Sequence, residues 1–171
     1  HEYDVDHRGE LFYIRSNKGC RNFRVVTAPL ADPGQNNWKE MLPCRSDVMV
    51  EDINVFAEYG VISEREDGLP RLRITDLKSG SSYRVDFPEA IYSTYISNNF
   101  EFATKALRFN YESFTTPPSV YDFDMATRER KLLKKREVLG GYDSSRYASE
   151  RRYATAADGT RVPISLVYRK G

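Results

Sequence analysis

The sequence has few of the residues that mark a metal site or a disulfide-stabilised fold. Its 171 residues include two cysteines, Cys20 and Cys44, whose spacing matches neither a C-x-x-C pair nor a zinc knuckle. It also contains no N-x-S/T glycosylation acceptor. We therefore predict two reduced, partly buried thiols rather than a disulfide, a cytoplasmic protein, and no metal or other cofactor.

Long hydrophobic runs and an excess of charge of one sign are also absent. No stretch of 18 or more apolar residues occurs, so no membrane-spanning helix is predicted. The 26 basic and 25 acidic residues give a net charge of +1, which supplies no overall field for nucleic acid or an anionic membrane. The one basic cluster, residues 128–137, is interrupted by Leu132 and Leu133 and is typical of an exposed outer strand. We expect neither nucleic acid nor a membrane as a partner.

A sustained helical period is missing from residue 10 onward, and short apolar runs separated by turn residues replace it. Leu72 and Ile74, for example, alternate with polar positions, as in a strand with one buried face. We predict strands at residues 11–14, 23–27, 38–42, 48–56, 59–64, 71–75, 82–87, 91–96, 106–111, 120–124 and 131–133. The expected fold class is all-β.

The predicted strands recur with a fixed period. Val25, Arg73 and Tyr121 are equivalent positions 48 residues apart, and Asp76 and Asp124, which each open a turn, differ by the same number. Four strands per unit of this length are typical of a β-propeller blade, although the G-H…W-D signature is absent. The sequence predicts a partial β-propeller of about three four-stranded blades.

Three blades do not close a ring, because propellers typically have four to eight. Either further blades belong to the intact protein or copies of the chain associate, and we favour the first. The absence of an initiator methionine supports the expectation that the chain is a piece of a longer protein.

The pattern changes after residue 138. Asp158-Gly159 is predicted to form a type I′ turn, and the run 162–168 alternates apolar and polar residues. We interpret this segment as the opening hairpin of a new domain, with an ordinary terminal hairpin as the alternative.

The C-terminal segment contains Asp-Gly-Thr-Arg-Val-Pro at residues 158–163, which resembles the prolyl oligopeptidase family of serine peptidases at large. It also contains Gly-Gly-Tyr-Asp at 140–143, Ser-Glu-Arg at 149–151 and Ser-Leu-Val-Tyr at 165–168, which resemble the oligopeptidase B branch of that family. The blade segments at residues 58–59 and 64–70 are similar too, so the resemblance covers nearly the whole chain.

The resemblance implies a hydrolase in which a seven-bladed propeller caps an α/β-hydrolase domain and admits short peptides, cleaved after Arg or Lys. This chain would then hold the last propeller blades at residues 1–139, a linker at 140–151 and the truncated start of the catalytic domain at 152–171. Its partners would be short basic peptides, the remaining blades and the catalytic domain. The alternative is a non-enzymatic propeller that acts as an interaction module.

No catalytic residue is assigned within the chain. The G-x-S-x-G elbow of an α/β-hydrolase is absent, and His1 and His7, the two histidines, precede the first predicted strand. We predict a hinge at Gly140 and Gly141, whose backbones permit large changes, with a passive linker as the alternative. Glu150 and Arg151 are predicted to pair across the interface between the domains.

Two other sets of side chains are candidates for chemistry. Residues 2–7 include four potential metal ligands, but we interpret them as an acidic turn that enters a blade; the four are Glu2, Asp4, Asp6 and His7. Asp122 and Asp124 lie on one face of a predicted strand, and we assign them to the entry of a turn rather than to acid–base catalysis.

Overall fold

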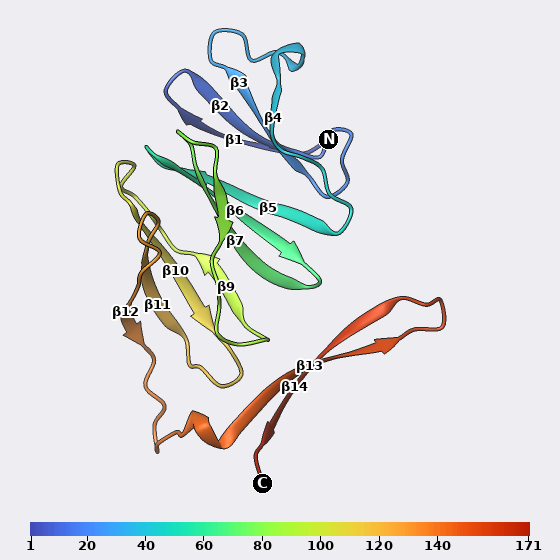
Figure 1. Cartoon of the computed structure of the whole chain (residues 1–171), viewed down its shortest axis with the longest axis vertical. Coiled ribbons are helices and arrows are strands. Elements are labelled where there is room, and N and C mark those ends of the chain that lie inside the picture. The colour runs from blue at the N-terminus through green and yellow to red at the C-terminus, as the bar shows by residue number, and fades with distance from the viewer. The chain divides into compact units, whose positions relative to one another are not determined.

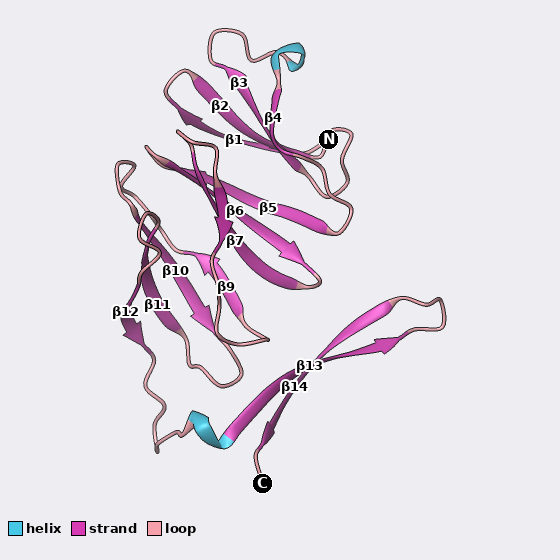
Figure 2. Cartoon of the chain, viewed as in Figure 1, coloured by secondary structure: helices cyan, strands magenta, loops and turns pink.

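The computed structural model describes residues 1–171, and its regular secondary structure consists of strands and two short 3₁₀ helices, joined by loops (Figure 2). The strands form three four-stranded sheets and one two-stranded sheet, all antiparallel, which confirms the all-β prediction. No helix is long and apolar enough to cross a membrane.

The chain separates into two compact units. The first comprises His1–Glu66, Arg71–Val85 and Asn99–Lys105. The second comprises Asp67–Pro70, Asp86–Asn98 and Ala106–Gly171.

Each four-stranded sheet is a simple meander in chain order, as in a propeller blade (Figure 1). The first contains β1 (Tyr3–Arg8), β2 (Leu11–Ser16), β3 (Arg24–Pro29) and β4 (Lys39–Leu42), with the 3₁₀ helix η1 (Gln35–Asn37) before β4. The second contains β5 (Val48–Val55), β6 (Tyr59–Glu66), β7 (Leu69–Asp76) and β8 (Ser82–Arg84). The third contains β9 (Ser93–Ile96), β10 (Ala106–Glu112), β11 (Ser119–Asp124) and β12 (Arg130–Lys135).

The interpretation of residues 2–7 as an acidic turn was wrong, because this stretch forms β1, which pairs with β2 from Tyr3 to Arg8. The strand is stabilised by polar contacts rather than by burial. The Asp4 carboxylate accepts from Arg15 at 2.6 Å, and the Asp6 carboxylate accepts from the Val55 N–H at 2.7 Å.

The 48-residue repeat is visible in hydrogen bonds. The Asp76 carboxylate accepts from the N–H groups of Lys78 and Ser79, each at 2.8 Å. The Asp124 carboxylate accepts from Ala126 and Thr127 at the same distances. The two aspartates therefore hold equivalent turns of the second and third sheets, as the period predicted.

Alternation along the strands supplies the core of each unit. In the first unit, apolar side chains of β2, β3, β5 and β6 pack into one cluster that includes Val25, Val50 and Ile62. In the second unit, Leu107 and Phe109 on β10 are fully buried, as expected for one face of a pleated strand.

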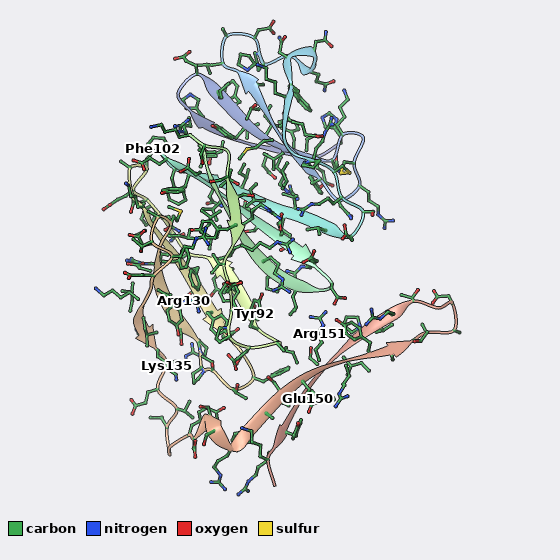
Figure 3. All side chains as sticks on the ribbon, viewed as in Figure 1. Tyr92, Phe102, Arg130, Lys135, Glu150 and Arg151 are labelled. Atoms are coloured by element: carbon green, nitrogen blue, oxygen red, sulfur yellow. A yellow bond between two sulfur atoms is a disulfide. The ribbon has the colours of Figure 1, made fainter.

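Aromatic rings fill the core of the second unit. Phe87 stacks on Tyr111 with ring centroids 5.3 Å apart and meets Phe109 edge-on at 5.7 Å. The guanidinium of Arg130 lies 5.2 Å from the Phe87 ring, and Figure 3 labels this arginine. The rest of β12 is exposed, which confirms that the basic cluster belongs to an outer strand.

The prediction of reduced cysteines was wrong. Cys20 and Cys44 form a disulfide, with Cα atoms 5.7 Å apart. Folding brings the β2–β3 loop beside the β4–β5 connection, although 24 residues separate the two cysteines in the sequence. The cytoplasmic location stays a prediction, but it loses the support that reduced thiols gave it.

The C-terminal hairpin pairs β13 (Tyr147–Thr155) with β14 (Arg161–Arg169). The predicted type I′ turn at its tip was wrong, because Gly159 has a φ of 83° but Asp158 does not have a positive φ. Thr155 pairs with Arg161, so a five-residue loop joins the strands. The hairpin turn in which two consecutive residues have a positive φ is instead the one between β6 and β7, formed by Asp67 and Gly68.

Candidate functional site

The candidate site is the segment that leads from β12 to the C-terminal hairpin, together with the residues that hold it. Gly140 and Gly141 both have a φ of 85°, and a Cβ added at either would meet nothing within 4 Å. The chain therefore uses two consecutive left-handed residues in open space, a conformation that is costly for any residue with a side chain. The hinge at these glycines stays a prediction.

The residues after the glycines are anchored at their first aromatic side chain. The Tyr142 hydroxyl donates to the carbonyl oxygen of Thr115 at 3.1 Å, and the Tyr142 ring stacks on Tyr147 at 5.7 Å. Asp143 caps the 3₁₀ helix η2 (Ser144–Arg146) by accepting from the Ser145 N–H at 3.0 Å. β13 then begins at Tyr147, inside the stretch predicted as linker.

The loop that carries Thr115 is itself fixed by one carboxylate. Four hydroxyl groups donate to Glu89: Tyr111 and Ser113 at 2.6 Å, Thr116 at 2.9 Å, and Thr115. Burial alone would raise the pKa of Glu89, but these hydrogen bonds hold it below its ordinary value of 4.5. Burial and the Glu89 carboxylate raise the pKa of the Tyr111 hydroxyl far above its usual range. The loop to which Tyr142 binds is therefore held by the ionised carboxylate of Glu89, which accepts hydrogen bonds from four hydroxyl groups.

A second anchor holds the hairpin. The Arg151 guanidinium lies 3.5 Å from the Asp67 carboxylate, and the Tyr153 hydroxyl donates to the same carboxylate. Arg151 has only 11% of its side chain exposed, and its terminal nitrogen lies 3.5 Å from where a Cβ would stand at Gly68. Two side chains of β13 therefore contact the Asp67-Gly68 turn, which belongs to the second unit.

A cation–π stack completes this second anchor. The Arg161 guanidinium lies 4.1 Å from the centre of the Tyr153 ring, and that of Arg151 lies 5.6 Å from it. Two guanidinium groups therefore lie near the Tyr153 ring, and the Tyr153 hydroxyl donates a hydrogen bond to Asp67.

Glu150 and Arg151 are neighbours on β13 and are labelled in Figure 3, but they make different contacts. Glu150 accepts from Arg152 at 2.8 Å and from the Tyr168 hydroxyl, both on its own hairpin. Hydrogen bonds from Tyr168 and Arg152 lower the pKa of Glu150. Of the two residues, Arg151 makes the contact outside the hairpin, and its partner Asp67 was not among the predicted site residues.

The other candidates from the sequence do not form a shared site. Asp122 makes a two-point ion pair with Arg108, at 2.8 and 2.9 Å, whereas Asp124 caps a turn. No group of three or more potential metal ligands is present.

Comparisons with known proteins place this architecture in one family. The profile of the prolyl oligopeptidase N-terminal β-propeller domain matches residues 1–136. The chain belongs to this family.

Relatives match the chain beyond the propeller residues. Dipeptidyl aminopeptidase BI of Pseudoxanthomonas mexicana is 42% identical over 171 residues, covering 99% of this chain and 23% of that protein. Oligopeptidase B of Trypanosoma brucei, in a closed form with covalently bound antipain, superposes with a TM-score of 0.88 at 35% identity, covering 98% of this chain and 25% of that one. Oligopeptidase B of Leishmania major superposes with a TM-score of 0.86 at 32% identity, covering 99% of this chain and 25% of that one. The chain spans about a quarter of the length of these relatives.

Proposed function

We propose that this chain is the substrate-gating propeller portion of a serine oligopeptidase, joined to the start of its catalytic domain. The observation that carries the proposal is the match that continues past the propeller. The family profile ends at residue 136, whereas the similarity to oligopeptidase B structures covers 98% of the chain at 35% identity, including the hairpin. The relatives named above are peptidases, which favours this function over a non-enzymatic interaction module.

In this proposal residues 1–139 are blades, 140–151 the linker and 152–171 the first part of the catalytic domain. The chain contains no G-x-S-x-G motif, so its contribution is gating and not the chemical step. Its partners are the remaining blades, the catalytic domain and short peptides.

Gly140 and Gly141 act as the pivot of this proposed gate, because their left-handed backbones lie in open space between two anchored segments. The contact of Arg151 and Tyr153 with Asp67 then favours one position of the hairpin. Breaking that contact would shift the population towards the open state.

The proposed substrates are short peptides cleaved after Arg or Lys, which the likeness to oligopeptidase B supports. The test compares hydrolysis of matched fluorogenic dipeptides that carry Arg, Lys, Pro or Phe before the scissile bond, using the full-length protein. We expect kcat/KM to be highest for Arg and Lys. A preference for Pro would overturn the specificity, and hydrolysis of none of the four would overturn the enzymatic proposal.

A further inference from the structure

The disulfide connects a loop of the first sheet to the segment that leads from the first sheet to the second, both in the first unit. Cys20 lies in the loop between β2 and β3, and Cys44 lies in the connection between β4 and β5. Cys20 is 4% exposed, whereas Cys44 is an exposed residue. The bond thus joins a buried residue to one at the surface.

Hydrogen bonds hold the same two segments together beside the disulfide. The Asn22 side-chain amide donates to the carbonyls of Arg45 at 3.0 Å and Ser46 at 2.8 Å. The Val50 N–H donates to the Asn22 carbonyl at 2.9 Å. These bonds place the backbone at residues 45–50 against the loop that the disulfide fixes.

The loop itself adopts a conformation that needs support. Phe23 has a φ of 63°, which is rare for a residue with a side chain. The Arg15 guanidinium lies 3.5 Å from the centre of the Phe23 ring and donates from Nε to the Val50 carbonyl at 2.9 Å. The loop and the start of β5 are therefore coupled through side chains as well as through sulfur.

The residue after Cys44 reaches the centre of the second sheet. Arg45 donates to the carboxylate of Glu64, which has no exposed side-chain surface. Arg73 on β7 and Arg84 on β8 donate to the same carboxylate, each at 2.8 Å. Burial would raise the pKa of Glu64, but hydrogen bonds from Arg73 and Arg45 hold it below its ordinary value. Arg45 links the connection to this buried charge.

We propose that the Cys20–Cys44 disulfide is a redox-controlled staple between the first and second sheets, and that it holds Arg45 against Glu64 when oxidised. A dithiol reductant opens it by thiol–disulfide exchange: two electrons and two protons pass to the protein, giving two thiols, and the reductant becomes its own disulfide. Disulfides persist in oxidising compartments and are rare in the cytosol, so a lasting oxidised form argues against the cytoplasmic location predicted from the sequence. This inference does not depend on the peptidase proposal.

The test is hydrogen–deuterium exchange on the full-length protein, as isolated, after treatment with dithiothreitol, and as the Cys20→Ser/Cys44→Ser variant. We expect amides of residues 20–26 and 44–50 to exchange at least roughly 30-fold faster in both altered forms, because a disulfide typically contributes about 2 kcal/mol or more. Peptides from β10 and β11, in the second unit, serve as the internal reference and should not change. Equal protection of residues 44–50 in all three forms would overturn the staple.

Two further measurements separate the parts of the proposal. Arg45→Met, with both cysteines intact, should leave the Val50 amide protected while the β6 amides near Glu64 exchange faster. Unchanged β6 exchange would overturn the link through Arg45. Trapping thiols with N-ethylmaleimide in living cells should leave Cys20 and Cys44 unlabelled and disulfide-linked, and quantitative labelling of both would overturn the oxidised state.

Discussion

Replacing Gly140 and Gly141 with alanine tests the proposed pivot. Both positions have a φ of 85° with no atom within 4 Å of an added Cβ, so the cost arises from the backbone conformation and not from a clash. A left-handed conformation costs a residue with a side chain roughly 1–2 kcal/mol, or about 2–4 kcal/mol for the pair. The linker equilibrium should therefore shift by roughly 30-fold to several hundred-fold.

The assay measures kcat and kcat/KM of the full-length enzyme on a fluorogenic dipeptide and on a peptide of about ten residues. We expect both parameters to change in the double-alanine variant, more for the longer peptide, because it needs the wider opening. Gly80→Ala is the matched control: Gly80 has a φ of 74°, also in open space, but lies in a surface turn. Arg128 occupies the equivalent turn position with a φ of 67°, so this turn accepts a side chain, and Gly80→Ala should leave turnover unchanged despite the same backbone cost. Unchanged turnover of a folded double-alanine variant would refute the pivot and favour a passive linker.

Three further predictions concern the second unit. Asp67→Asn should weaken the contact with the hairpin and speed amide exchange in β13. A double-mutant cycle with Arg151→Met should give a coupling energy of about 0.2–1 kcal/mol, because the Asp67 side chain is 55% exposed. A coupling energy of zero would contradict the contact. Phe109→Ala should lower the free energy of unfolding by about 3–5 kcal/mol in urea titrations, whereas the exposed control Tyr95→Ala should change it by about 0.5 kcal/mol or less. Because the folded pKa of Glu89 is below 4.5, its ionised form stabilises the fold above that pH, and this contribution is lost as the pH falls through the folded value. Glu89→Gln should therefore reduce the loss of stability between pH 7 and pH 3, measured as the fall in the urea midpoint of unfolding. An unchanged fall in the midpoint would contradict this assignment.

The blade architecture was predictable because its signals are local and repeated. Leu72 and Ile74 alternate with polar residues on β7, and Asp76 and Asp124 close identical turns 48 residues apart. β1 was missed because its burial is slight and its pairing depends on Asp4 and Asp6, whose partners lie on other strands.

Contacts between distant residues were beyond sequence reasoning. The disulfide depends on a loop and a connection that fold side by side, and the spacing of the two cysteines carries no sign of it. The turn dipeptides show the same limit: Asp67-Gly68 forms the two-residue turn, whereas the identical dipeptide at 158–159 lies in a longer loop. Arg151 was predicted as a contact residue, but its partner Asp67 lies 84 residues earlier and no local pattern joins them.

The central claim is that this chain is the gate of a serine peptidase. The most direct measurement treats the native protein from its source with a fluorophosphonate, which labels activated serines, and then identifies the labelled polypeptide by mass spectrometry. The account predicts one labelled polypeptide that yields peptides from this chain and has an intact mass several times 19.8 kDa. A polypeptide that contains this chain and takes no label would contradict it.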